Sequence, residues 1–166
     1  MSPAATLRAA RAADAAVIAA IYNEGIASRQ ATFETADRDA GDVAGWLAAG
    51  LPFLVAEDGG RVIGWARVSP ASDRGVYAGV GEHGVYVTAG AQGAGVGRAL
   101  LDGLCAEARR AGFHKLHSRI FTTNGPSLAV HRAAGFREVG VQLRHGRLDG
   151  EWKDCVLVER LLGEAA

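Results

Sequence analysis

Apolar and polar residues recur along this chain with two periods, one typical of helices and the other of strands. Four segments have apolar side chains three or four positions apart, which is the spacing of one helix face. These helices are expected to begin after Asp14, after Asp39 or Asp42, after the glycine-rich stretch 90–97 and at Asn124. The third of them would bury Leu100, Leu101, Leu104, Cys105 and Ala108.

Short runs rich in β-branched and aromatic residues lie between these helices and predict strands. Asp58-Gly59-Gly60 separates two of the runs, so those two are expected to form a hairpin. The last two strands are expected to be joined by a connection over 145–152. In chain order the expected strands are 6–11, 53–57, 62–68, 82–87, 116–121, 136–143 and 155–158.

This order of elements predicts a mixed α/β fold with a central strand–loop–helix–strand unit. A chain of 166 residues has the length of one ordinary domain, and a core of that size can close without disulfides or metals. No repeat, linker or low-complexity segment divides the sequence. We therefore expect a single domain over 1–166.

Charge and cysteine content exclude several classes of protein. Eighteen basic and eighteen acidic residues cancel, which argues against nucleic-acid and membrane-surface partners because both are bound through a basic excess. No run of about 18 apolar residues is present, so no membrane-spanning helix is expected. Cys105 and Cys155 form neither a disulfide framework nor a zinc pattern, so a cytoplasmic location is the default. His114 and His117 have no third ligand nearby, and we expect no metal.

Glycine accounts for 23 residues, about twice its average share. Several glycines follow the strand over 82–87 and open a helix, and such a turn binds anions because the first helical N–H groups lack internal partners. A P-loop would need lysine where Val96 stands. The dinucleotide fingerprint would place its third glycine at Arg98 or Leu100. Neither motif fits, and a tight turn without a ligand remains an alternative.

The pattern that does fit is Gln92-Gly93-Ala94-Gly95-Val96-Gly97 followed by Arg98. It resembles the acetyl-CoA pyrophosphate loop of the GNAT family of N-acetyltransferases, and the closing segment Ala133-Ala134-Gly135-Phe136 resembles that family's signature as well. The resemblance covers nearly the whole chain. It implies a mixed, mostly antiparallel sheet of about seven strands flanked by about four helices, with acetyl-CoA as co-substrate. It implies as acetyl-CoA contacts Val85, Tyr86, Val87, Gly93, Ala94, Gly95, Val96, Gly97, Arg98, Asn124 and Ser127.

A narrower resemblance connects the chain to the phosphinothricin N-acetyltransferase branch. The segments that carry it are 31–35, 51–57, 82–87 and 150–154. The stretches 77–82 and 145–150 are most similar to the arsinothricin N-acetyltransferases of that branch. The branch implies acetylation of the α-amino group of a small glutamate-like amino acid such as phosphinothricin, arsinothricin or methionine sulfoximine, which is a detoxification activity.

Acyl transfer to an amine requires that the amine lose a proton and that the departing thiolate be stabilised. The resemblance implies that Glu82 is the base and that His131 protonates the thiolate, while a backbone N–H near Val87 meets the carbonyl oxygen. Each residue also has a structural interpretation. Glu82 could be a strand-end carboxylate that faces solvent or pairs with Arg74, and His131 could be a half-buried histidine that satisfies a backbone carbonyl.

The resemblance also implies that Arg74 and Tyr77 hold the anionic amino acid and that Phe33 lines its pocket. A guanidinium fork suits a carboxylate, phosphinate or arsinate. Arg67 is a further candidate, although the herbicide-resistance enzymes have an aromatic residue at that position. His145 is expected at the rim of the pocket.

Two other functions stay open at this stage. The acceptor could be a protein N-terminus, a lysine or another metabolite amine. The protein could also be a non-catalytic acyl-CoA sensor, although the presence of both Glu82 and His131 argues against that. The relatives are commonly homodimers, and the resemblance implies the same assembly here.

Overall fold

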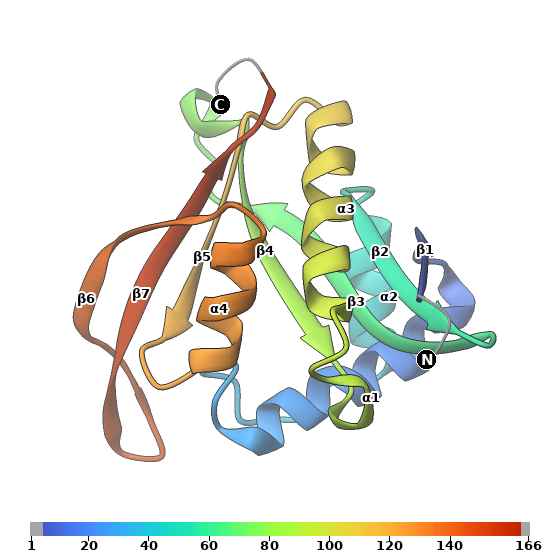
Figure 1. Ribbon diagram of the computed structural model, residues 1–166, viewed down its shortest axis with the longest axis horizontal. Coiled ribbons are helices and arrows are strands. Elements are labelled where there is room, and N and C mark those ends of the chain that lie inside the picture. The colour runs from blue at the N-terminus through green and yellow to red at the C-terminus, as the bar shows by residue number, and fades with distance from the viewer. Residues whose placement is uncertain (1–4, 164–166) are drawn as a thin grey trace.

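The computed structural model describes residues 5–163, in which seven strands form one mixed sheet (Figure 1). The strands are β1 (Thr6–Ala9), β2 (Phe53–Asp58), β3 (Arg61–Pro70), β4 (Val80–Val87), β5 (Lys115–Phe121), β6 (Arg137–Leu148) and β7 (Glu151–Leu161). They lie in the order β1-β2-β3-β4-β5-β7-β6. All neighbours are antiparallel except β4 and β5, which confirms the mixed, mostly antiparallel sheet.

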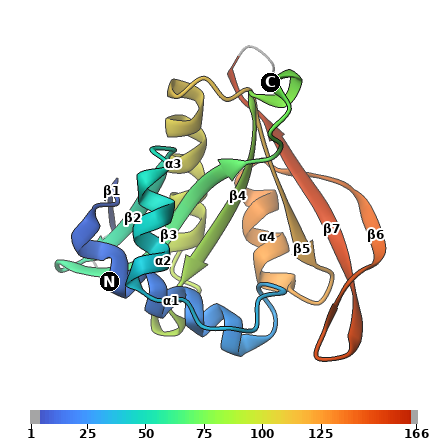
Figure 2. The same cartoon turned by 180° about the vertical axis from the view of Figure 1, so that it is seen from behind.

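Four α-helices of the described chain cover the two faces of the sheet. They are α1 (Ala15–Ser28), α2 (Ala40–Ala48), α3 (Val96–Arg110) and α4 (Gly125–Ala133). Figures 1 and 2, drawn from opposite sides, show α3 and α4 on one face and α1 and α2 on the other. Single 3-10 turns lie at Ala12–Asp14, Gly75–Tyr77 and Ala89–Ala91.

Side-chain alternation along the strands divides the core into two layers. Val55 and Trp65 pack in the layer under α1 and α2, whereas Leu54 and Ala66 pack in the layer under α3. The apolar face expected for α3 is buried as predicted. Its five members are at most 5% exposed: Leu100, Leu101, Leu104, Cys105 and Ala108.

The two parallel strands in the middle of the sheet separate from each other along their length. β4 and β5 pair over only three positions, from Val80 opposite Lys115 to Glu82 opposite His117. Beyond Glu82 they diverge toward the end of the sheet where α3 and α4 begin (Figure 1). The fold therefore leaves an opening next to two helix N-termini.

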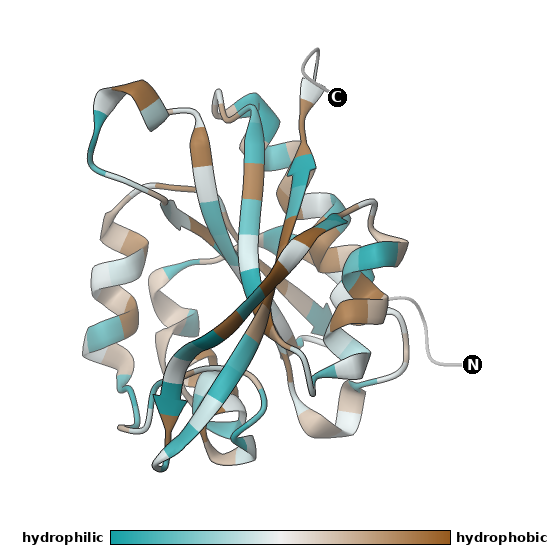
Figure 3. Cartoon of the chain, turned by 90° about the vertical axis from the view of Figure 1, so that its left-hand side faces the viewer, coloured by the Kyte–Doolittle hydropathy of each residue, from teal (hydrophilic) through white to brown (hydrophobic). Residues whose placement is uncertain are grey.

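The C-terminal hairpin differs from the sequence prediction. The stretch 145–152 is not a loop, because β6 continues to Leu148 and β7 begins at Glu151 (Figure 3). The turn consists of Asp149 and Gly150 alone, with φ angles of 51° and 82°. Such an Asp-Gly pair at positive φ forms a tight two-residue hairpin turn. The prediction ended β6 too early because a bulge between Gln142 and Gly146 interrupts the alternation of side chains.

The helices α1 and α2 begin where the sequence predicts, but only one of the two expected caps forms. Asp39 caps α2, since its Oδ1 accepts a hydrogen bond from the backbone N–H of Asp42 at 2.9 Å. Asp14 does precede α1, yet its carboxylate does not cap that helix. It accepts hydrogen bonds from the Arg8 guanidinium at 2.8 Å and the Arg11 backbone N–H at 2.9 Å. The ion pair with Arg8 therefore engages the Asp14 carboxylate in place of the helix cap.

Three further features concern the whole described chain. No group of three or more His, Cys, Asp or Glu residues between 5 and 163 is arranged to hold a metal ion. Over the same residues, no helix has both the length and the apolar character to cross a membrane. Cys105 and Cys155 are both buried and free.

Candidate active site

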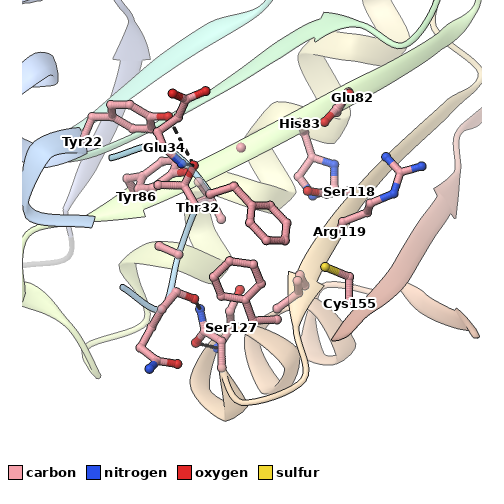
Figure 4. A pocket seen from close by; sticks show the side chains of 18 of the residues that line it. Tyr22, Thr32, Glu34, Glu82, His83, Tyr86, Ser118, Arg119, Ser127 and Cys155 are labelled. Atoms are coloured by element: carbon pink, nitrogen blue, oxygen red, sulfur yellow. Dashed lines mark hydrogen bonds between the residues drawn. The ribbon is translucent and has the colours of Figure 1, made fainter. Parts of the chain in front are cut away.

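A cavity of about 450 Å³ lies where β4 and β5 separate. It is bounded by β3, β4, β5, β6, the start of α4 and the loop that follows α1. Figure 4 shows Glu82 and His83 on β4 and Arg119 on β5, at the two sides of this space. Six of the residues that line it carry the chemistry considered below: Arg67, Glu82, His83, Arg119, Ser127 and His131.

Glu82 lies at the point where the opening begins. It is opposite Ser69 of β3 and His117 of β5, so the three side chains share one face of the sheet. Arg67 and Arg119 lie two residues further along the neighbouring strands, on the same face and toward the wide end of the opening. A carboxylate therefore sits between two guanidinium groups, one on each side.

These three charged side chains have no ion-pair partner in the described chain. Within residues 5–163 none of Glu82, Arg67 and Arg119 takes part in a salt bridge. Arg67 lies over the ring of Trp46 at 4.2 Å, and burial lowers the pKa of its guanidinium. The Nε of Arg119 donates to the Gln142 side chain at 2.8 Å. The half-buried Arg67 guanidinium has no carboxylate partner among the described residues, which favours a bound anion because the anion would offset its desolvation.

Backbone groups of β4 also face the opening. Thr88 N–H donates to the Ile63 carbonyl at 2.9 Å, so by alternation the N–H groups of Val85 and Val87 point away from β3. β5 does not pair with β4 at this level. The Val87 carbonyl, which points the same way, accepts from Gln92 Nε2 at 3.0 Å. The structure thus presents the amide groups of Val85 and Val87 to the opening.

The glycine-rich loop joins β4 to α3 at the same end of the sheet. Gly93 and Gly95 have φ angles of 81° and 83°, and α3 begins at Val96 directly after them. Among the residues that the structure describes, no side chain caps the N-terminus of α3. Its first amide groups are therefore available for an anion such as a pyrophosphate, and the positive end of the helix dipole lies there too. Arg98 is exposed and lies 3.8 Å from Asp102.

The implied acetyl-CoA contacts at the start of α4 are already engaged in the fold. Asn124 caps α4 by accepting from the Ser127 backbone N–H at 3.2 Å, and its amide donates to the Gln30 carbonyl at 3.0 Å. His131 Nδ1 lies 2.8 Å from the Ser127 carbonyl oxygen and 3.4 Å from Ser127 Oγ. The His131 side chain therefore satisfies a backbone carbonyl, and at 3% exposed it is buried rather than half-buried. All three residues still line the cavity.

His131 also contacts a second histidine. Its Nε2 lies 2.9 Å from Nε2 of His83, and the two side chains belong to residues only 3% and 4% exposed. Burial lowers the pKa of His83 well below its ordinary value of 6.5 and lowers the pKa of His131 below the same value. Unfolded imidazoles would take up protons near pH 6.5, so this pair stabilises the fold above that pH and loses its contribution as the pH falls below it.

The substrate residues implied by the resemblance are only partly brought together. Phe33 lines the cavity and packs against Phe121 with ring centroids 4.8 Å apart. Arg74 and Tyr77 do not line it. They belong to the turn before β4, where the Arg74 guanidinium lies 5.7 Å from the centroid of the Tyr77 ring, and Tyr77 is 47% exposed. His145 does reach the cavity, as expected.

Sequence reasoning missed two residues of this site, His83 and Arg119. His83 could have been found from strand alternation, because it follows Glu82 and must point to the opposite face, toward α4. Arg119 had no local signal. It enters the site only because the parallel pairing sets His117 opposite Glu82, and that register cannot be read from the sequence.

Comparison with known families and proteins gives a consistent result. The model of the acetyltransferase (GNAT) family matches residues 18–136. The chain is 36% identical to a phosphinothricin N-acetyltransferase from Alcaligenes faecalis, over 96% of this chain and 83% of that protein. It is 34% identical to the L-amino acid N-acyltransferase MnaT from Escherichia coli (strain K12), over 96% of this chain and 95% of that protein.

A solved structure extends the likeness to three dimensions. The chain superimposes with a TM-score of 0.91 on a GNAT superfamily phosphinothricin acetyltransferase from Sinorhizobium meliloti in complex with acetyl-CoA. The two are 35% identical, and the match covers 98% of this chain and 90% of that one. These relatives point to the same family as the cleft between β4 and β5 and the glycine-rich turn. The chain therefore belongs to the acetyltransferase (GNAT) family and is an acetyl-CoA-dependent acyltransferase.

Proposed function

We propose that this protein transfers an acetyl group from acetyl-CoA to the α-amino group of a small glutamate-like amino acid, of the phosphinothricin, arsinothricin or methionine sulfoximine type. The observation that carries the proposal is the position of Glu82 between Arg67 and Arg119, neither of which forms a salt bridge within residues 5–163. A base flanked by two cationic groups suits an amino acid with a carboxylate and a second polar or anionic group. The relatives named as phosphinothricin and L-amino acid acyltransferases support this acceptor class.

Each proposed role follows from a position in the cleft. Glu82 would accept the proton of the substrate ammonium, directly or through water, because an ammonium has no lone pair with which to attack. The amides of the loop at Gly93, Gly95 and Val96 would hold the pyrophosphate of acetyl-CoA, which supplies the activated acetyl thioester. The Val87 N–H would stabilise the carbonyl oxygen as it gains charge. Arg98, Asn124 and Ser127 remain proposed contacts of the same co-substrate.

The size of the cavity favours a small acceptor. A volume of about 450 Å³ is at the lower end of ordinary small-molecule pockets. Phe33, which packs over Gly146, closes one side of it. We keep Arg74 and Tyr77 as proposed substrate residues, which would have to reach the acceptor from outside the cavity lining. A protein N-terminus or lysine would need a groove that continues past these side chains.

Replacing Arg119 by glutamine tests the acceptor class. The change removes one of the two cations beside Glu82 and should raise the KM for phosphinothricin and arsinothricin by roughly 10–100-fold, since a charged hydrogen bond is lost. The KM for acetyl-CoA should not change. Steady-state assays of thiol release, with amino acids, an N-terminal peptide and a lysine peptide as acceptors, measure both.

Arg61→Gln is the matched control, because it removes one exposed charge from β3 at the far end of the strand. An equal loss in both variants would contradict a specific role for Arg119. Faster transfer to the peptides than to any amino acid would favour the second acceptor class. Tight acetyl-CoA binding with no transfer to any amine would favour a sensor.

We further propose that the chain forms a single domain and that the protein is located in the cytoplasm. There it would form a homodimer through the edge strand β6. Val139, Val141 and Leu143 of β6 are 42%, 56% and 75% exposed, and Trp152 of β7 is 50% exposed. In the described part of the chain, β6 has a neighbouring strand on one side only. An exposed apolar edge strand is favourable for pairing with a second copy.

Val141→Glu is expected to convert the dimer to a monomer, because it buries a charge in the proposed contact. Sedimentation velocity measures the change in mass. Ala20→Glu, at an exposed position of α1, is the control and should stay dimeric. A dimer that persists in Val141→Glu, or a wild-type monomer at all concentrations, would contradict the proposed interface.

A further inference from the structure

Two buried histidines meet end to end on the α4 side of the cavity. His83 comes from β4 and His131 from α4, and their Nε2 atoms are 2.9 Å apart. The ring of Phe136 packs against both, with centroid separations of 4.8 Å to His83 and 5.2 Å to His131. The contact ties the strand that carries Glu82 to the helix that borders the other side of the cleft.

When both rings are neutral, the hydrogen bonds of His131 favour one arrangement of protons. The Ser127 carbonyl oxygen can only accept, so the His131 Nδ1 that lies 2.8 Å from it must carry a hydrogen. A neutral His131 then has no hydrogen on Nε2, and this atom accepts from His83 Nε2–H. His83 Nδ1 is consequently bare. It is also a buried nitrogen that has no hydrogen-bond partner in the described chain.

The opposite arrangement would place two acceptors against each other. If His131 carried its hydrogen on Nε2, its bare Nδ1 would face the Ser127 carbonyl oxygen at 2.8 Å. Two lone pairs at that distance in a buried site cost the full desolvation of both groups. The groups that face His83 are the His131 side chain from α4 and, from β5, the side chain and the backbone of His117. A contact with the His117 backbone raises the pKa of His83 by less than burial lowers it, and no carboxylate in this set would favour an imidazolium.

We propose that His83 is a positioning residue, whose Nε2–H holds His131 in the tautomer that carries its hydrogen on Nδ1, next to Ser127. The hydrogen that His131 presents near the cleft is therefore on Nδ1, 3.4 Å from the Ser127 hydroxyl oxygen. Nε2 is occupied by His83 and is not the donor. The tautomer assignment stands on the hydrogen bonds alone. Its effect on turnover rests on the proposed function, with His131 as the proposed acid that protonates the departing thiolate.

Nitrogen-15 NMR of the histidine side chains tests the assignment without turnover. At pH 7 the wild-type protein should show His131 protonated on Nδ1 only and His83 protonated on Nε2 only. The Nε2–H tautomer at His131, or an imidazolium at either residue, would overturn the proposal. His83→Leu should leave His131 as a mixture of tautomers, while His83→Gln should keep the Nδ1–H form because its amide can still donate to Nε2.

Kinetics separate positioning from packing. His83→Leu should lower kcat about tenfold with an unchanged KM for acetyl-CoA, the effect of one lost neutral hydrogen bond. His83→Gln should recover most of kcat. Phe136→Leu is the matched control, since it disturbs the same packing without removing a hydrogen bond and should keep kcat.

Equal losses of kcat in His83→Leu and Phe136→Leu would overturn the positioning role. If His83→Leu fails to fold, the tautomers of the wild-type protein decide the matter. The expected tautomers in a protein that transfers acetyl to no amine would refute the proposed function and leave the positioning assignment intact.

Discussion

Replacing Glu82 by glutamine is expected to lower kcat for acetyl transfer by roughly 10²–10⁴-fold at pH 7, the usual contribution of a general base. Glutamine keeps the shape of the side chain but cannot accept a proton from the ammonium of the acceptor. Isothermal titration should show unchanged binding of acetyl-CoA, because the implied contacts of that molecule lie further along β4 and in the glycine-rich loop. Steady-state assays of thiol release measure kcat.

The pH dependence makes this test sharper. In the variant, the residual rate should rise with pH across the alkaline range, because solvent then supplies the free amine that Glu82 no longer produces. Glu34→Gln is the matched control. Glu34 also lines the cavity, but its carboxylate already pairs with Arg38 at 2.8 Å. An unchanged kcat in Glu82→Gln would remove Glu82 as the base.

Replacing Gly95 by valine is expected to weaken acetyl-CoA binding tenfold or more. Gly95 has a φ of 83°, a left-handed conformation that costs a β-branched residue about 1–2 kcal/mol or more. The loop would relax to avoid this strain, and the amides at the start of α3 would then turn away from the pyrophosphate. Isothermal titration with acetyl-CoA measures the change in Kd.

Gly90→Val is the matched control for the loop. Gly90 lies in the same stretch, its φ is not in the left-handed region, and a side chain there would meet open space. Its Kd for acetyl-CoA should remain close to that of the wild type. Equal Kd values for wild type and Gly95→Val would contradict the assignment of this turn as the pyrophosphate site.

The parts of the fold that could be predicted are those that local chemistry decides. The turn after β4 can be predicted because a glycine-rich stretch directly before a helix has few alternative structures. In the structure Gly93 and Gly95 of this stretch have positive φ, and α3 begins without a side-chain cap from the described residues. The apolar face of α3 can be predicted from the spacing of its apolar residues. The end of β6 cannot be predicted in this way, because the bulge at Arg144 (φ 47°) is stabilised by a hydrogen bond to Asp154, ten residues away.

The candidate site shows the same division. Glu82 and His131 were found through motif context, and the structure places both at the cavity. Arg119 depends on a parallel register that joins strands far apart in the chain. His131 was expected to be an acid or a buried hydrogen-bonding histidine, and only the contact with His83 shows how its two nitrogens are used. Tertiary pairing therefore decides what composition and spacing leave open.

The central claim is that this cleft acetylates the amine of a small glutamate-like amino acid. The most direct measurement incubates the purified protein with acetyl-CoA and L-phosphinothricin, follows thiol release and identifies the product by mass spectrometry. We expect one thiol released for each molecule of acceptor that gains a single acetyl group on its α-amine. Release of no thiol with phosphinothricin, arsinothricin or methionine sulfoximine, from protein that binds acetyl-CoA, would contradict the claim.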